Sequence, residues 1–525
     1  MGNYLNPGSK RFRECLQSKI YVDKSGLIEY TNSVIDTLQK YVCVSRPRRF
    51  GKSMAANMLA AYYSCGENTD NMYRELKINS ASSYKEHLNK HDVIMLNIQE
   101  FWSKTNVIED MLDLMQKRII KELQMTYHLE GMDSEHLDWA MQDIYNFTGR
   151  SFIILIDEWD CLFRESQRDI ESQKKYLDFL RTWLKDQEYV GLAYMTGILP
   201  IKKYGSHSAL NMFSEYSMTN PGGLAEFFGF TETEAEKLCH QHGMSFEETK
   251  AWYDGYTLGN EQSVVSIYNP KSVVEAMLHH SFQNYWNLTE TYEALKNYIK
   301  MNFDGLKDAA ITMLAGGRIE INPGKFKNDM ISVSGKNDVL TLLVHLGYLT
   351  FDLETRTVAI PNKEVSEEYM NAVEDIGWDE VLRSVSASRD LLQSLWNLNE
   401  HEVARGIDRA HQEVSILQYN DENALSYTIN LAFYAARDYY TVIRELPAGK
   451  GFADIGMIPR KIHADKPAVI IELKWDKSAK GAISQIKDKQ YVAAFEEYKG
   501  NLILAGINYD RVKKIHSCEI EKVTL

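Results

Sequence analysis

The nine residues from Ser45 to Ser53 read SRPRRFGKS, a combination of residue types that can hold phosphate. The segment follows an apolar run, Tyr41–Val44, and precedes residues 54–60, which can form a helix. Backbone N–H groups at the start of a helix bind anions because they have no partner within the helix. A strand, a loop ending in Gly-Lys-Ser and a helix are the context of a P-loop. The sequence therefore predicts a nucleotide site, with ATP as the expected ligand.

The last five residues of this segment are the predicted nucleotide contacts. Arg49 and Phe50 lead into Gly51, where the absence of a side chain lets the backbone approach phosphate. Lys52 can neutralise phosphate charge, and the hydroxyl of Ser53 can bind Mg²⁺. We expect these residues to act together on one nucleotide.

One residue departs from the pattern G-x-x-x-x-G-K-[ST]. Arg46 stands where the pattern has its first glycine. Arg46, Arg48 and Arg49 could contact phosphate within their own chain or reach a neighbouring molecule, and the sequence leaves both open. An ordinary basic loop before a helix is the alternative interpretation of the segment.

A second strand is predicted to supply acidic groups to the same site. Residues 151–156 are largely apolar and end at Asp157 and Glu158, which is typical of a strand buried on both faces. We expect Asp157 to hold Mg²⁺ and Glu158 to polarise an attacking water. Thr196, near the end of the apolar stretch 191–198, is a candidate for sensing the γ-phosphate. The alternative is a buried strand whose acidic end simply meets solvent.

The order of elements predicts an α/β fold. Helical periodicity over 106–128 and 172–187 alternates with the apolar runs, which indicates a mostly parallel sheet with nucleotide at the carboxyl ends of its strands. Farther along, residues 338–349 predict a helix that stops at glycine, and residues 350–361 predict a hairpin. A helix followed by a hairpin resembles a winged-helix element.

The C-terminal part contains a separate group of candidate catalytic residues. An apolar strand from Ala468 ends by placing Glu472 and Lys474 on one face, and Asp454 lies on the preceding strand. Charged groups are costly to bury without partners. A divalent cation, Mg²⁺ or Mn²⁺, held by Asp454 and Glu472 would compensate the carboxylates, and Lys474 could orient water or stabilise developing charge.

Two helices flank this strand pair. Glu422, in the upstream helix, is a candidate to face the same metal, and Gln485, in the downstream helix, lies four residues from Lys489 on one face. A hairpin with a solvent-facing salt bridge and a surface helix is the alternative interpretation.

Composition limits the classes of function. The formal net charge of −14 argues against a protein that coats nucleic acid indiscriminately, although a local basic groove remains compatible with it. Six cysteines without a C-x-x-C pair suit a reducing cytoplasm. No apolar run approaches the ~20 residues needed to span a bilayer, and the N-terminus has no apolar signal core. We therefore expect a cytoplasmic protein without a membrane partner.

Both groups of residues resemble one bacterial family, in which an AAA-ATPase-like domain is fused to a C-terminal PD-(D/E)XK nuclease-superfamily domain. The resemblance covers nearly the whole chain and rests on these segments: Tyr21–Ser25, Ser45–Ser53, Ile156–Glu158, Thr196–Ile198, Trp252–Tyr256, Tyr268–Pro270, Gly451–Asp454, Glu472–Lys474, and Gln485 with Tyr491. The SRPRRFGKS sequence is similar to that family's own form of the P-loop. The resemblance implies roles in defence or mobile-element biology.

The length of 525 residues predicts about three domains. We expect an AAA-ATPase-like P-loop domain over residues 1–225, a helical and winged-helix-like region over 226–385, and a PD-(D/E)XK nuclease-like domain over 386–525. The leading hypothesis is an ATP-hydrolysing protein coupled to a metal-dependent nuclease that acts on nucleic acid, with DNA favoured over RNA. Its oligomeric state is open, and a homo-oligomer is one expectation. The alternatives are an ATP-gated switch whose nuclease-like fold only binds, and a signalling or scaffold protein that binds no nucleic acid.

Overall fold

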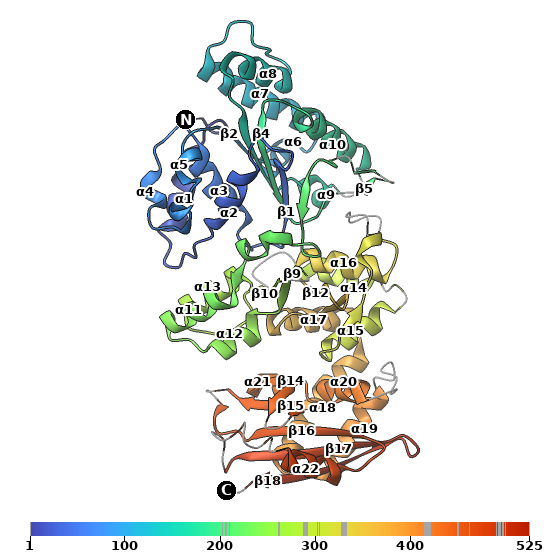
Figure 1. Ribbon diagram of the computed structural model, residues 1–525. Helices are drawn as coiled ribbons and strands as arrows, with labels where there is room; N and C mark the ends of the chain where they lie inside the picture. The colour runs from blue at the N-terminus through green and yellow to red at the C-terminus, as the bar shows by residue number, and fades with distance from the viewer. Residues whose placement is uncertain are drawn as a thin grey trace. The chain divides into compact units, whose positions relative to one another are not determined.

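Five parallel strands form the sheet that carries the phosphate-binding segment (Figure 1). In spatial order the strands are β2 (Asp92–Asn97), β3 (Phe152–Asp157), β4 (Val190–Gly197), β1 (Tyr41–Ser45) and β7 (Ser214–Tyr216). All residues of β1, β3 and β4 are buried, which explains their continuous apolar sequences. The predicted parallel α/β sheet is confirmed.

The computed structural model describes residues 2–523 except for gaps at 167–168, 202, 205–206, 209, 261–262, 287–291, 302, 304, 327–332, 414–421, 449–450, 461–462, 490, 492–494, 496–497 and 499. The chain divides into two units, each with its own core. The first contains Met1–His242, Asp254–His280 and Ile321–Val358, and the second contains Gly243–Tyr253, Ser281–Glu320 and Ala359–Leu525.

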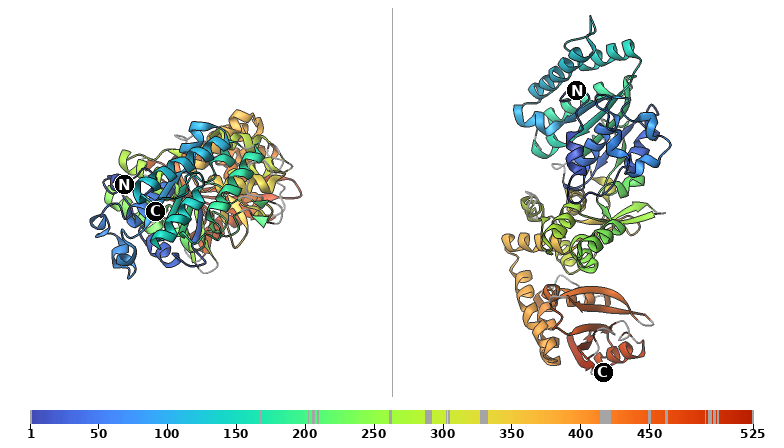
Figure 2. Two further views of the ribbon diagram at one scale, coloured as in Figure 1. Left: turned by 90° about the horizontal axis from the view of Figure 1, so that it is seen from above. Right: turned by 90° about the vertical axis from the view of Figure 1, so that its left-hand side faces the viewer.

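Helices cover both faces of the parallel sheet. Figure 1 shows α3 on one side and α10 on the other, and α7 packs against α8 (Figures 1 and 2). The helices of the first unit are α1 (Lys10–Leu16), α2 (Gly26–Val34), α3 (Lys52–Tyr63), α4 (Asp70–Tyr73), α5 (Tyr84–His87), α6 (Ile98–Thr105), α7 (Ile108–Tyr127), α8 (Leu137–Thr148), α9 (Cys161–Glu165), α10 (Ile170–Leu184), α11 (Glu232–His242), α13 (Pro270–His279) and α16 (Lys336–Leu346), with 3₁₀ turns η1 (Lys77–Ser80), η2 (Gly222–Phe227) and η4 (Pro323–Lys325).

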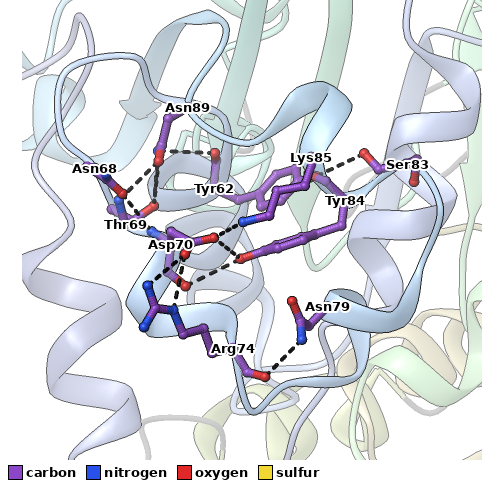
Figure 3. A network of polar contacts seen from close by, with 10 residues as sticks. All are labelled: Tyr62, Asn68, Thr69, Asp70, Arg74, Asn79, Ser83, Tyr84, Lys85 and Asn89. Carbon is purple, nitrogen blue, oxygen red and sulfur yellow. Dashed lines mark hydrogen bonds and ion pairs between the residues drawn. The ribbon is translucent and has the colours of Figure 1, made fainter.

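The helix that follows the phosphate-binding segment is held at its far end by a polar network (Figure 3). The side-chain amide of Asn89 donates to the carbonyls of Ala61, Tyr62 and Ser64 at the end of α3. The last carbonyl groups of a helix have no partner within that helix, so Asn89 satisfies acceptors that α3 cannot satisfy itself. Beside this cap, Asp70 accepts a hydrogen bond from the Tyr84 hydroxyl at 3.1 Å. The network fixes the C-terminal end of α3, whose other end begins the predicted nucleotide site.

A three-stranded antiparallel sheet lies within the range that the sequence predicts as helical. Its strands, in the order β8-β10-β9, are β8 (Phe230–Thr231), β10 (Ser263–Tyr268) and β9 (Tyr256–Asn260). Helical periodicity could not indicate it, because these strands are short and lie between helices. The remaining short strands before residue 321 are β5 (Lys203–Tyr204), β6 (His207–Ser208) and β11 (Ile319–Glu320).

The predicted helix and the two strands after it are present. Helix α16 ends where Gly347 adopts a left-handed conformation with φ of 88°, and the strands β12 (Thr350–Asp352) and β13 (Thr357–Ala359) follow. The hydroxyl of Tyr256 in β9 donates to the carbonyl of Gly347 at 2.7 Å. The element is therefore joined to the antiparallel sheet by a buried hydrogen bond.

The second unit is built around a mixed sheet in the order β14-β15-β16-β17-β18. Only the β16–β17 pair is parallel. Helices α19 (Glu400–Glu413) and α20 (Glu422–Ala432) contribute to the core on one face, and α22 (Ala479–Asp488) packs on the other. The strands are β14 (Tyr440–Ala448), β15 (Gly451–Pro459), β16 (Ala468–Trp475), β17 (Leu502–Asp510) and β18 (Ile515–Val523).

The helices of this unit are α12 (Phe246–Tyr253), α14 (Tyr292–Lys300), α15 (Leu306–Leu314), α17 (Lys363–Ile376), α18 (Asp379–Trp396), α19 (Glu400–Glu413), α20 (Glu422–Ala432), α21 (Ala436–Tyr439) and α22 (Ala479–Asp488). Within the described residues of the whole chain, no helix has the length and apolar character needed to cross a bilayer.

Helix α22 packs so closely on β17 that a side chain at Gly506 should destabilise the protein. A Cβ atom at Gly506 of β17 would lie 2.3 Å from the carbonyl oxygen of Ala479 in α22. Because that oxygen belongs to the backbone, the helix itself must shift, and we expect Gly506→Ala to lower the free energy of unfolding by about 2 kcal/mol. Scanning calorimetry of the full chain should show a lower midpoint. Gly223→Ala, where a Cβ meets nothing within 4 Å, is the control, and equal midpoints for both variants would contradict the packing.

Candidate functional site

The phosphate-binding segment joins β1 to α3 through a left-handed turn. Arg49 has φ of 70° and Gly51 has φ of 91°. The first intrahelical bond of α3 runs from the N–H of Ala55 to the carbonyl of Gly51 at 2.9 Å. The N–H groups of the preceding helical residues therefore have no partner within the helix, as anion binding requires. Ser53 is exposed in this first turn.

Lys52 is held inside the loop that it would serve. Its side chain is 5 % exposed, and its Nζ donates to the carbonyls of Arg46 and Pro47, both at 2.9 Å. Burial lowers the pKa of Lys52, and the charges of Glu158 and Asp157 oppose that shift. The ammonium group thus has backbone acceptors that a phosphate group could replace.

Asp157 and Thr196 meet at the carboxyl edge of the sheet. Oδ1 of Asp157 accepts hydrogen bonds from the Thr196 hydroxyl and from the N–H of Glu158. Asp157 is 3 % exposed, and no lysine or arginine of the described residues forms an ion pair with it. A buried carboxylate of this kind fits a divalent cation, which Asp157 could hold with Ser53.

Glu158 is held by a residue that the sequence analysis did not identify. Its backbone is left-handed, with φ of 54°, and its carboxylate forms an ion pair with Arg164 in α9. Burial raises the pKa of Glu158, while Arg164 and Lys52 oppose the shift. Arg164 also contacts Asp160 at 3.2 Å, and the four-residue spacing of that pair is the signal that could have revealed it.

Asp160 has a structural role at the same carboxyl edge of the sheet. It is fully buried, and its Oδ2 accepts hydrogen bonds from the N–H groups of Ile198 and Leu199 at 3.0 and 2.8 Å. It therefore fixes the chain just after β4 and Thr196.

Phe50 has a packing role within the loop. Its ring is buried and lies 5.2 Å from the ring of Tyr256 in an edge-on contact. Its carbonyl accepts a hydrogen bond from the N–H of Gly229 at 3.1 Å. The ring of Phe50 packs against Tyr256, so a nucleotide contact at this residue would have to use the backbone.

The second group of candidate residues lies on the face of the mixed sheet that α22 covers. Glu472 is 2 % exposed, and its Oε1 accepts hydrogen bonds from Lys474 Nζ at 3.0 Å and from the amide of Gln485. Asp454 lies on β15 next to Ile455, which pairs with Ile471 of β16, and its charge acts on Glu472. Its Oδ2 accepts a hydrogen bond from the N–H of Leu473 at 2.6 Å.

The electrostatics of this group favour a bound cation. Burial, with the nearby charge of Asp454 as a second cause, raises the pKa of Glu472 to about 7, while Lys474 opposes the shift. Oε2 of Glu472 is buried and has no hydrogen-bond partner. The described residues contain no cluster of three or more His, Cys, Asp or Glu side chains suited to a metal. Two carboxylates nevertheless fit Mg²⁺ or Mn²⁺, because such ions retain water and substrate oxygens as ligands.

Not all predicted residues can be placed. Glu422 begins α20, but its side chain lies outside the described part of the structure. Gln485 reaches Glu472, whereas Lys489 is exposed. Tyr491 is buried, and a Cβ at Gly451 would lie 3.2 Å from its hydroxyl. The structure thus gathers most of the predicted residues into two groups, one in each unit.

Comparisons with known proteins agree with this division. Residues 8–206 match the family model described as a predicted AAA-ATPase, and residues 421–519 match that of the PD-(D/E)XK nuclease superfamily. An uncharacterized protein in the vnfD 5′ region of Azotobacter chroococcum mcd 1 is 25% identical over 283 residues, covering 52% of this chain and 51% of that protein. The chain thus spans about half the length of this curated relative.

Among solved structures, the ORC2 protein of Aeropyrum pernix (ADPNP-ADP complexes) matches with 10% identity and a TM-score of 0.30, covering 69% of this chain and 97% of that one. The two family matches include both groups of candidate residues. The chain therefore carries a predicted AAA-ATPase domain at residues 8–206 and a PD-(D/E)XK nuclease-superfamily domain at residues 421–519.

Proposed function

We propose that the protein hydrolyses ATP in its first unit and cleaves phosphodiester bonds of nucleic acid in its second, with DNA favoured over RNA. The observation that carries the proposal is the buried Glu472, whose Oε2 has no hydrogen-bond partner beside the carboxylate of Asp454 and the ammonium of Lys474. A nuclease-superfamily domain that served only to bind would gain nothing from this arrangement of charge.

In the first unit, each residue has a proposed role in ATP hydrolysis. Lys52 exchanges its two loop carbonyls for phosphate oxygens, and Asp157 and Ser53 hold Mg²⁺. Glu158 orients the attacking water once its ion pair with Arg164 opens. Thr196 shares a hydrogen bond with Asp157 and can therefore sense the γ-phosphate through it.

In the second unit, Asp454 and Glu472 hold the metal and Lys474 donates a proton or hydrogen bond to the reacting oxygen atoms. Gln485 keeps Glu472 oriented through its amide hydrogen bond. At both sites the bound cation would neutralise phosphate charge and lower the pKa of a coordinated water. The role of Glu422 stays a prediction.

The ATP half of the proposal is tested at Lys52. We expect Lys52→Ala to lower kcat/KM for ATP by about 10²–10³-fold, because a preorganised charge on the phosphates is removed. Phosphate release measures the turnover, and Lys117→Ala, an exposed lysine paired with Asp113, is the control. Turnover that survives in Lys52→Ala would show that the ATPase site lies elsewhere.

The nuclease half is tested at Glu472. We expect Glu472→Gln to lower the cleavage rate by about 10²-fold or more while leaving ATP turnover unchanged, because the substitution removes one metal-binding charge. The measurement is cleavage of a panel of single- and double-stranded DNA and RNA with Mg²⁺ or Mn²⁺, with and without ATP. Asp465→Asn, at an exposed carboxylate, is the control. Intact substrates throughout the panel with the wild-type protein would reject nuclease activity and favour a binding module.

The raised pKa of Glu472 predicts how metal binding depends on pH. Metal binds the carboxylate form, so below the pKa of about 7 each bound cation must displace a proton. We expect the apparent affinity for Mn²⁺ to rise about tenfold per pH unit up to about pH 7 and then to level off. Isothermal titration calorimetry measures this, and an affinity that does not change below pH 7 would contradict the assignment.

The same pKa has a consequence for stability without metal. The folded-state pKa of Glu472 lies above its ordinary value, so the folded protein favours the protonated form. Stability therefore falls as pH rises from the ordinary value of a glutamate toward the raised one. Glu472→Gln, which carries no titrating group, should lack this component.

A further inference from the structure

Arg46 is a fully buried cation within the phosphate-binding segment. It is the first residue after β1, and its side chain has 0 % exposure. Its own N–H donates to the carbonyl of Gly197 in β4 at 3.0 Å, and its carbonyl accepts from Lys52 at 2.9 Å. The backbone of Arg46 therefore belongs to the sheet edge and to the predicted nucleotide site at once.

Among the described residues, the partners of the Arg46 guanidinium group are neutral. Its Nη1 donates to the carbonyls of Ser45 and Tyr216, both at 2.9 Å, and the group lies 5.5 Å from the ring centre of Phe228. Its Nε and Nη2 are buried without a hydrogen-bond partner. Within the described residues, Arg46 forms no ion pair, so its charge is not neutralised by any carboxylate.

The surroundings leave this charge in place at neutral pH. Burial lowers the pKa of Arg46 to about 10, so the guanidinium remains protonated. The hydroxyl of Tyr194 in β4 is also buried without a hydrogen-bond partner, and its charge state interacts with that of Arg46. The surroundings of the Arg46 side chain thus contain unsatisfied donors and a retained positive charge.

An uncompensated buried cation destabilises a protein unless something offsets it. Glycine, which the P-loop pattern has at this position, would carry no such cost. A polyphosphate bound to the adjacent N–H groups would bring negative charge to the same loop, and charges interact strongly where water is excluded. An anion bound at this loop would therefore offset the cost of burying the Arg46 charge.

We propose that Arg46 acts as a fixed, buried positive charge within the phosphate-binding segment, increasing affinity for polyphosphate nucleotides without touching them. Arg46 is on this account a positioning residue that acts through the field it creates and through the loop it holds. The inference rests on the proposed nucleotide site at Lys52. If the charge of Arg46 attracts the nucleotide, then its effect on affinity depends on the number of phosphate charges that the nucleotide carries.

A purely structural role makes a different set of predictions. If Arg46 only tied the loop to Tyr216 and Phe228, its loss would lower the stability of the nucleotide-free protein and weaken every nucleotide by a similar factor. If its charge matters, the loss of charge should raise the stability of the nucleotide-free protein and weaken ATP more than ADP, and ADP more than AMP.

The test compares Arg46→Met, which removes the charge at similar length, with Arg46→Lys, which keeps it. Binding of ATP, ADP and AMP is measured by isothermal titration calorimetry on the full chain, and melting temperature is measured without nucleotide. We expect Arg46→Met to weaken ATP binding about tenfold, because a partly screened positive charge is removed from the segment that binds phosphate, with smaller losses for ADP and AMP. Arg46→Lys should retain most of the affinity. Arg181→Met, at a half-exposed arginine of α10, controls for net charge.

Each outcome decides the inference. Equal losses for the three nucleotides, or equal losses in the Met and Lys variants, would overturn it in favour of a structural tie. Unchanged ATP affinity in Arg46→Met would overturn it outright. If Arg46→Met does not fold, Arg46→Gln, which keeps a donor for the Tyr216 carbonyl without charge, makes the same comparison with Arg46→Lys. If the wild-type protein binds no nucleotide, and Lys52→Ala does not differ from it, the proposed nucleotide site fails first, and Arg46 has no role in it.

Discussion

The hydrogen bond from Thr196 to Asp157 exists because β3 and β4 run in the same direction and end at the same edge of the sheet. The same parallel register places Ser45 beside Gly197, so the phosphate-binding segment leaves the sheet at that edge too. Reversing any one of these strands would move its final residue to the opposite edge, a strand length away. Strand direction therefore determines which side chains in the first unit can act together, before their chemistry is considered.

Two buried charged groups, Glu472 in the second unit and Arg46 in the first, are only partly satisfied and have opposite signs. In the second unit, Glu472 is a buried acid whose ionised form needs a cation, and the hydrogen bonds from Lys474 and Gln485 satisfy only one of its oxygens. In the first unit, Arg46 is a buried base whose donors are only partly satisfied. Each group has the charge opposite to that of the ligand proposed for its site. Burying an incompletely paired charge costs free energy, and a bound ligand of opposite charge would offset that cost at either position.

Continuous burial made the central strands and their acidic ends predictable. β1, β3 and β4 are buried on both faces, so their sequences are apolar throughout, and the carboxylates of Asp157 and Glu158 mark where β3 ends. β7 carries only half-buried residues, and so it has no such signal. Lys474 and Glu472 could be placed on one face from strand alternation alone. The spacing of Asp160 and Arg164 indicates that pair, but the contact of Arg164 with Glu158 depends on the turn between β3 and α9. The burial of Arg46 depends on Tyr216 and Phe228, which are distant in sequence.

The left-handed backbone at Glu158 has a consequence for how this position can change over evolutionary time. A side chain other than glycine in that conformation costs about 1 kcal/mol, so selection for stability alone would favour glycine or asparagine at residue 158. Either replacement would remove the carboxylate that is paired with Arg164. The backbone conformation and the ion pair therefore favour different residues at this position. Residue 158 should therefore become variable in any descendant that no longer needs the carboxylate. It should vary earlier than the residues of the surrounding core.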